Sequence, residues 1–320
     1  MIFDTHAHYD DRAFDGDREQ VLASLAGAGV GRIIDVAASV PSLERVKAMA
    51  DRYDFVYGAL GLHPDEVGTH SRHAGEPFSL SGGTGGSVSG LTPEIREWLR
   101  QALSDPKIAA VGEIGLDYHW NIEPREVQIR CFKEQILLAL EAGLPILVHS
   151  RSAAEDTLNV ILEMYGPGEK GRKVAKQEAE KKLLPEQYSA VPGKEWVWKK
   201  EVPEGPGFRA EKKGIIHAYA YPPEQARIYT GLGFMLGIGG VLTYGNSRKL
   251  KKVVREIPLE FLVLETDCPY LAPEPHRGER NWSGYLRSVV RAIAEIKEIS
   301  EAEVEQVTWE NACRLVRQGT

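Results

Sequence analysis

Eight short apolar runs, separated by longer stretches with a helical spacing of apolar residues, constrain the fold of this chain more than any other feature of its sequence. The runs are rich in β-branched residues and lie at 2–3, 32–36, 55–60, 108–112, 145–148, 214–216, 234–238 and 261–265. Short apolar runs without a polar face are typical of strands buried in a parallel sheet. Eight strands that alternate with helices predict an α/β fold of the (β/α)₈ or TIM-barrel type.

The helical spacing is clearest in two stretches. Residues 127–141 place apolar side chains on one helical face, and Gly143 follows them as a C-terminal cap. Residues 284–296 repeat that spacing near the end of the chain. We therefore expect an amphipathic helix over each stretch.

Two segments interrupt this rhythm. Residues 73–92 are rich in glycine and serine, which predicts a flexible loop. Residues 166–213 are dense in lysine and glutamate, with room for a short helix over 170–184. The segments fall after the third strand and between the fifth and sixth, where a barrel has loops. We expect two long insertions in a single barrel domain that spans residues 1–320.

Charge and cysteine content limit the class of protein. The net charge of −7 argues against a general polyanion-coating protein, although a basic rim or bound cations can reverse the field near one site. The cysteines, Cys131, Cys268 and Cys313, are widely spaced and form no CxxC pair, which suits a reducing compartment. No signal-peptide pattern or membrane-span length of apolar residues is present. We expect a soluble cytoplasmic protein with no membrane partner and no evident obligate protein partner.

Histidines and carboxylates gather where the predicted strands end. They are His6 and His8 after the first strand, His63 after the third, Glu113 after the fourth, His149 after the fifth, His217 after the sixth and Asp267 after the eighth. In a barrel these ends meet on one face, which is where active sites lie. A single histidine is more often an ordinary packed residue, so the interpretation depends on the joint pattern.

The spacing of these residues suits a catalytic metal centre. Because side chains alternate along a strand, His6 and His8 point to the same side and can bind one ion together. Glu113 has two oxygens that can bridge two ions, and Asp267 would complete the first site. The histidines after the fifth and sixth strands would complete a second. Imidazole and carboxylate ligands without thiolate suit Zn²⁺, Mn²⁺ or Mg²⁺.

Six segments of the sequence resemble the TatD family of metal-dependent hydrolases, within the amidohydrolase superfamily. They are FDTHAHYDD, GLHP, AVGEIGLDYHW, LPILVHSR, GFMLGIGGVLTY and FLVLETDCPYLAP. The resemblance implies a (β/α)₈ barrel, divalent metals and hydrolysis of phosphodiester bonds, usually in DNA and often from an end. It also implies that one ion is held by His6, His8, Glu113 and Asp267, and the other by Glu113, His149 and His217.

Several positions on the substrate side depart from the family pattern. Tyr9 replaces an aliphatic residue, Ser152 replaces an aspartate, and Trp282-Ser283 replace a Glu-Pro pair. The residues after His217 differ as well. Because the ligands are kept, the departures bear on the substrate more than on the class of reaction.

Together with this resemblance, the residues lead us to expect a two-metal hydrolysis of a nucleic-acid end. Asp267 would orient the attacking water and act as general base, and His63 would hydrogen-bond the phosphate or else cap the turn at Pro64. Charge and stacking at a single-stranded DNA end would come from four residues, Tyr118, Arg151, Arg277 and Arg280.

Two other functions fit the same barrel. A metal-dependent deacylase or amidohydrolase could act on aminoacyl-tRNA or on a small ester or amide, since fold and metal ligands do not identify a substrate. A non-catalytic scaffold is the third possibility, against which the intact ligand set argues, because buried carboxylates and imidazoles without a metal are costly to keep together.

Overall fold

The computed structural model describes residues 1–68, 77–78, 86–87, 91–166 and 213–315. Its main sheet has eight strands, each parallel to its neighbours. In sheet order these are β1 Ile2–Ala7, β2 Val30–Val36, β3 Val56–Ala59, β6 Ile108–Asp117, β7 Ile146–Arg151, β8 Gly214–Ile216, β9 Phe234–Ile238 and β10 Leu262–Leu264. All eight predicted strands are confirmed, and the sheet curls into a nearly closed barrel.

The barrel closes where the first strand meets the last. β1 and β10 share no ladder, but an isolated parallel bridge joins Ala7 to Cys268. The amide of Asp267 donates to the carbonyl of His6 at 2.9 Å, and the amide of His8 donates to the carbonyl of Cys268 at 2.9 Å. These bonds place the segment after β10 directly beside the end of β1.

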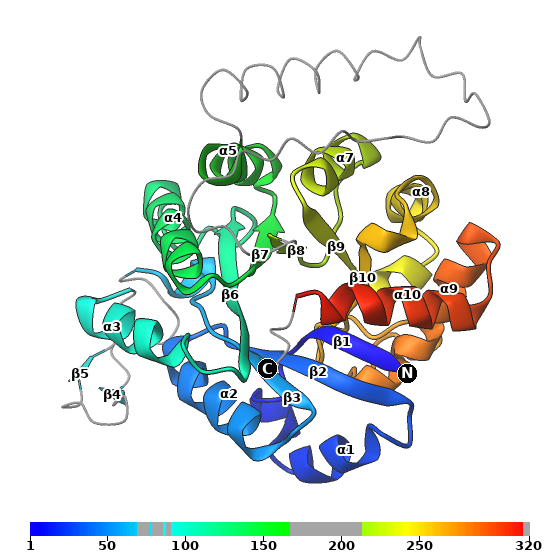
Figure 1. Ribbon diagram of the computed structural model, residues 1–320, viewed down its shortest axis with the longest axis horizontal. Coiled ribbons are helices and arrows are strands. Elements are labelled where there is room, and N and C mark those ends of the chain that lie inside the picture. The colour runs from blue at the N-terminus through cyan, green and yellow to red at the C-terminus, as the bar shows by residue number, and fades with distance from the viewer. Residues whose placement is uncertain (69–76, 79–85, 88–90, 167–212, 316–320) are drawn as a thin grey trace.

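Helices surround the strands (Figure 1). They are α1 Arg18–Ser24, α2 Val40–Arg52, α3 Pro93–Ala102, α4 Arg125–Ala142, α5 Ala154–Tyr165, α7 Pro223–Gly231, α8 Arg248–Glu256, α9 Leu286–Lys297 and α10 Glu301–Cys313. Short 3₁₀ turns are η1 Arg12–Phe14, η2 Pro64–Glu66, η3 Gly240–Thr243, η4 Leu259–Phe261 and η5 Ser283–Tyr285. Within the described residues, no helix is both long and apolar enough to cross a membrane.

Local sequence sets the helix ends. The hydroxyl of Thr92 accepts from the amide of Ile95 at the start of α3, where Pro93 takes the first helical position. Gly143 ends α4 with φ of 64°, in the left-handed region that glycine enters without a steric penalty. The predicted helices over 127–141 and 284–296 are therefore confirmed as α4 and as η5 followed by α9.

One apolar cluster fills the inside of the barrel. Its members come from all eight strands and include Phe3, Ile34, Leu147, Met235 and Val263. Ala312 of α10 joins the same cluster, and α10 contacts both β1 and β10. This helix covers one end of the barrel. The polar residues lie at the strand ends on the opposite side, where a functional site can form.

Two details differ from the sequence expectation. β6 continues five residues beyond the predicted run 108–112, because the segment to Asp117 keeps pairing with β7. The glycine-rich segment 73–92 contains a short antiparallel pair, β4 Pro77–Phe78 and β5 Gly86–Ser87, where a loop was expected. The helix expected over 170–184 lies outside the described residues, as does most of the insertion 166–213.

Candidate metal centre

The predicted ligands converge at one end of the barrel. His6 lies in β1, Glu113 in β6 and His149 in β7, while His217 follows β8 and Asp267 comes shortly after β10. Most of these side chains are buried, and that of Asp267 is the most exposed of the set, at 20%. Asp267 therefore lies where the cluster meets solvent.

Four of the side chains form one compact group. The Nε2 atoms of His6 and His8 lie 3.2 Å apart. Glu113 Oε2 lies 3.5 Å from Nε2 of His6 and 3.8 Å from Nε2 of His8. Asp267 Oδ1 lies 3.3 Å from Nε2 of His8. Ligand atoms about 2.1 Å from a tetrahedral ion are roughly 3.4 Å apart, so these spacings suit donors to one cation.

The second oxygen of Glu113 faces other imidazoles. Its Oε1 lies 2.7 Å from Nδ1 of His149 and 3.8 Å from Nε2 of His217. Nε2 of His217 is also 3.7 Å from Asp267 Oδ1, so this histidine touches both ends of the cluster. Glu113 thus has one oxygen toward each half of the centre, as a bridging carboxylate requires.

In three of the histidines, one ring nitrogen lies beside an oxygen outside the proposed metal position and the other nitrogen faces the cluster, whereas Nδ1 of His6 is buried without a hydrogen-bond partner among the described residues. Nδ1 of His8 lies 2.7 Å from the carbonyl of Val36, which can only accept, so Nδ1 carries a proton and Nε2 is the nitrogen that faces the cluster. Nδ1 of His217 lies 3.2 Å from Glu265 Oε2. Nε2 of His149 lies 3.1 Å from Asp117 Oδ2. In each case the other nitrogen faces the cluster, which is the arrangement of metal-binding histidines. The donor set therefore fits divalent cations.

The carboxylates of this cluster also raise the pKa of two of its histidines, His8 and His149. Burial lowers the pKa of His8, but the hydrogen bond and charge of Asp267 outweigh it and raise the pKa to about 10. Burial also lowers the pKa of His149, but the hydrogen bonds and charges of Asp117 and Glu113 outweigh burial and raise this pKa to about 10. These protons occupy the lone pairs that a cation would use, so metal binding near neutral pH has to displace them.

His63 lies beside the centre as a hydrogen-bond donor. Its Nδ1 accepts from the amide of Asp65 at 3.2 Å and so caps η2. Burial and the neighbouring charge of His149 lower the pKa of His63 to about 3, which keeps the ring neutral. The proton of the neutral ring is therefore on Nε2. The ring centroid lies 4.3 Å from that of His149, so this donor is next to the predicted ligands.

The four residues expected to contact substrate are held in different ways. The Tyr118 hydroxyl donates to Asp156 at 2.7 Å. Arg280 donates to both carboxylate oxygens of Asp17, at 2.8 and 2.6 Å, and to the carbonyl of Ala13. Arg277 lies 4.4 Å over the ring of Tyr244. Arg151 is exposed at the end of β7. Tyr118 and Arg280 thus have structural partners, and Arg151 ends the strand that carries His149.

Two departures from the family pattern contact each other. The hydroxyls of Tyr9 and Ser283 lie 2.8 Å apart and both are buried. Ser283 Oγ also donates to Asp4 Oδ2 at 2.6 Å, and Asp4 Oδ1 accepts from the amide of His6 at 3.2 Å. These replacements therefore belong to a buried network under the metal ligands rather than to the open side of the site.

Sequence reasoning assigned no role to Glu265 or Asp117. A signal was available, because Asp117 lies four residues after Glu113 in one strand and Glu265 two residues before Asp267, spacings that put side chains on one side of an extended chain. Glu265 also accepts from the amide of Ala218 at 2.6 Å. A Cβ at Gly237 would lie 1.9 Å from Glu265 Oε2, so glycine there makes room for this carboxylate.

Glu265→Gln is expected to weaken metal binding by about 10- to 100-fold. The amide removes the charge that orients and polarises His217, while its size keeps the packing against Gly237. Isothermal titration with Mn²⁺ measures the change. Glu260→Gln, on the 3₁₀ turn before β10, serves as control. Unchanged affinity in Glu265→Gln would show that His217 does not depend on this partner.

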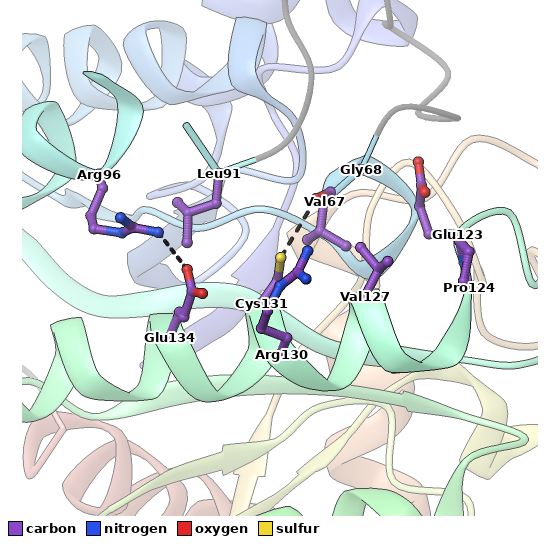
Figure 2. Close-up of a pocket in the computed structure, with 10 residues that line it drawn as sticks. All are labelled: Val67, Gly68, Leu91, Arg96, Glu123, Pro124, Val127, Arg130, Cys131 and Glu134. Carbon is purple, nitrogen blue, oxygen red and sulfur yellow. Dashed lines mark hydrogen bonds and ion pairs between the residues drawn. The ribbon is translucent and has the colours of Figure 1, made fainter. Parts of the chain in front are cut away.

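A cavity of about 420 Å³ lies outside the metal centre. Figure 2 shows it between α4 and the segment after η2, with the ion pair of Arg96 and Glu134 at 2.5 Å along one side. Cys131 of α4 donates to the carbonyl of Val67 in its wall. No predicted ligand lines this cavity, so it is separate from the centre.

Comparison with known proteins gives consistent results. The family model described as TatD related DNase matches residues 3–317. The protein named uncharacterized metal-dependent hydrolase YabD, from Bacillus subtilis, is 33% identical over 317 residues that cover 99% of each chain. The one named TatD, from Mycobacterium tuberculosis, is 28% identical over 98% of this chain and 97% of its own. The crystal structure of YjjV, a TatD homologue from Escherichia coli, superposes with a TM-score of 0.72 at 26% identity, covering 99% of this chain and 98% of that one.

Proposed function

The chain belongs to the TatD family of metal-dependent hydrolases, and from that membership we propose that it hydrolyses phosphodiester bonds in DNA, working from a single-stranded end with two divalent cations. The observation that carries the proposal is the position of Glu113. Each of its oxygens faces different imidazoles, and Asp267 lies at the open side of the same cluster. Divalent cations held by these residues would supply the charge stabilisation that in-line displacement at phosphorus needs.

The ligands divide into two sets that share one carboxylate. The proposed sets are His6, His8, Glu113 and Asp267 for one ion, and Glu113, His149 and His217 for the other. Cations bound there would supply Lewis acidity to the scissile phosphate and to the attacking water, and Mg²⁺, Mn²⁺ and Zn²⁺ all accept these donors.

Asp267 is the proposed general base. Burial raises its pKa, but the charges of His217 and His8 outweigh burial and hold the pKa below its ordinary value, so the group is ionised at neutral pH. Its backbone has φ of 60°, a conformation uncommon outside glycine, which aims the carboxylate at His8 from the loop after β10. An ionised carboxylate on the solvent side of the cluster can take the proton from an attacking water.

His63 and the basic residues are proposed to bind the substrate. The Nε2 proton of His63 is placed to hydrogen-bond a phosphate oxygen beside His149. Arg151 and Arg277 supply positive charge to a DNA backbone, and Arg280 shapes the loop after β10 through its bonds to Asp17. Charge of this kind favours a phosphodiester over a neutral ester or amide.

We also propose a single domain over 1–320 and a cytoplasmic location. All of the described strands belong to one barrel apart from the short pair β4 and β5. The three cysteines form no disulfide, and two of them are buried, as suits a reducing compartment.

End-labelled single-stranded DNA tests the function directly. The purified protein is incubated with the DNA in the presence of Mg²⁺, Mn²⁺ or EDTA. A parallel reaction uses an oligoribonucleotide of the same sequence. We expect stepwise shortening of the DNA that requires metal. No cleavage by a protein whose two bound ions are confirmed by elemental analysis would overturn the nuclease proposal and favour a deacylase or amidohydrolase.

A further inference from the structure

Trp120 presents an exposed indole close to the metal centre. Its side chain belongs to the segment after β6, and the residue is 56% exposed. The amide of Trp120 donates to Asp117 Oδ1 at 3.0 Å, while Asp117 Oδ2 lies 3.1 Å from Nε2 of His149. One buried carboxylate therefore fixes both a metal ligand and the backbone that carries the indole.

Arg151 places a positive charge beside this indole. β6 and β7 pair so that Asp117 lies opposite Arg151, and the amide of Tyr118 donates to the carbonyl of Arg151 at 2.9 Å. The Arg151 guanidinium lies 5.5 Å from the centroid of the Trp120 ring. An aromatic surface and a cation thus occur together, two residues beyond His149 along β7.

Tyr118, the other aromatic residue after β6, is less exposed than Trp120. The Tyr118 hydroxyl donates to Asp156, and the guanidinium of Arg125 lies 4.1 Å from its ring centroid. These contacts cover the ring and tie it to α5. Of the two aromatic residues after β6, Trp120 exposes the larger fraction of its surface, 56%, and is the better candidate to contact a ligand.

We propose that Trp120 and Arg151 form a platform on which a nucleobase of the DNA end stacks, next to the phosphodiester that is cleaved. This inference rests on the proposed function and names the part of the substrate that the site recognises. Bases stack on tryptophan whatever their identity, and the guanidinium of Arg151, which lies over one face of the indole, can also bind a neighbouring phosphate. A platform of this kind would hold a DNA end without reading its sequence.

The test compares two oligonucleotides that differ only in having a base or an abasic sugar at the terminal nucleotide. We expect the wild-type protein to cleave the oligonucleotide with the base about 10- to 100-fold faster in kcat/KM. Trp120→Ala should remove this preference, and Trp120→Phe should keep part of it because a smaller aromatic face remains. Leu137→Ala, which truncates an exposed apolar side chain on α4, is the matched control.

Two measurements separate a wrong platform from a wrong function. Thermal unfolding should be unchanged in Trp120→Ala, because the contact of Asp117 with residue 120 is made by the backbone. If Trp120→Ala keeps the preference, or if the wild type has none, the platform is wrong and the nuclease stands. If the wild type cleaves neither oligonucleotide, the proposed function is wrong. Fluorescence anisotropy of the same pair with the Mn²⁺-loaded proteins then decides the platform, and equal binding overturns it.

Discussion

Glu113→Gln is expected to lower DNA hydrolysis by roughly a thousandfold or more and to release bound cations. Its two oxygens face different halves of the centre, so one substitution removes charge from both. An amide offers a single neutral oxygen, and the charge stabilisation of several kcal/mol that a metal site supplies corresponds to this range of rates. No other residue of the cluster has contacts on both sides through separate carboxylate oxygens.

Two measurements test this expectation: the initial rate on end-labelled single-stranded DNA, and the metal content of the protein after gel filtration. Glu134→Gln is the matched control, since that carboxylate lies in an ion pair with Arg96 on the outside of the barrel. Full activity with two bound ions in Glu113→Gln would mean that Glu113 is not the bridging ligand. Full metal content with lost activity would instead assign it a role in the chemistry alone.

Asp267→Asn is expected to lower single-turnover hydrolysis by about 100- to 10,000-fold, with little change in unfolding temperature. Asparagine keeps the shape of the side chain and tolerates the positive φ of this position, but it cannot accept a proton from water. The loss should fall on the single-turnover rate constant at saturating protein and not on the affinity for DNA, because the residue acts on the attacking water more than on the bound DNA.

The matched control is Asp105→Asn. That carboxylate lies before β6 at the other end of the barrel and is paired with Lys47 at 2.7 Å. Differential scanning calorimetry reports stability beside the kinetic assay. Wild-type turnover in Asp267→Asn would exclude Asp267 as the base, and a large drop in unfolding temperature would show that the activity loss is structural.

Much of the architecture could be predicted from the sequence because strand and helix patterns follow local periodicity. All eight strands were located, and polar residues at their ends indicated a common face. The extension of β6 could not be predicted, because Gly112 and Gly115 interrupt the apolar pattern. Gly115 is required there, since a Cβ on it would lie 1.9 Å from the carbonyl of His149. Contact across strands, which the sequence does not show, decides the length of β6.

The substrate side was harder to predict for a related reason. Tyr118 and Trp120 look alike in the sequence as aromatic residues after a strand, and the sequence does not show that Asp156 and Arg125 contact the first of them. Arg280 looks like a DNA contact until Asp17, more than two hundred residues away in the chain, is seen to hold it. Periodicity places a residue on an element, but the partner of an arginine depends on tertiary folding.

The way the barrel closes determines when, during translation, the residues of the cluster can come together. His6 and His8 are synthesised long before Asp267, which follows the last strand and is hydrogen-bonded to the end of β1. The cluster therefore cannot be completed before β10 and the segment after it have been made. A truncated or stalled chain lacks the carboxylate that completes the cluster. A chain whose synthesis stops before Asp267 should therefore lack the proposed nuclease activity, so incompletely synthesised protein does not cleave DNA.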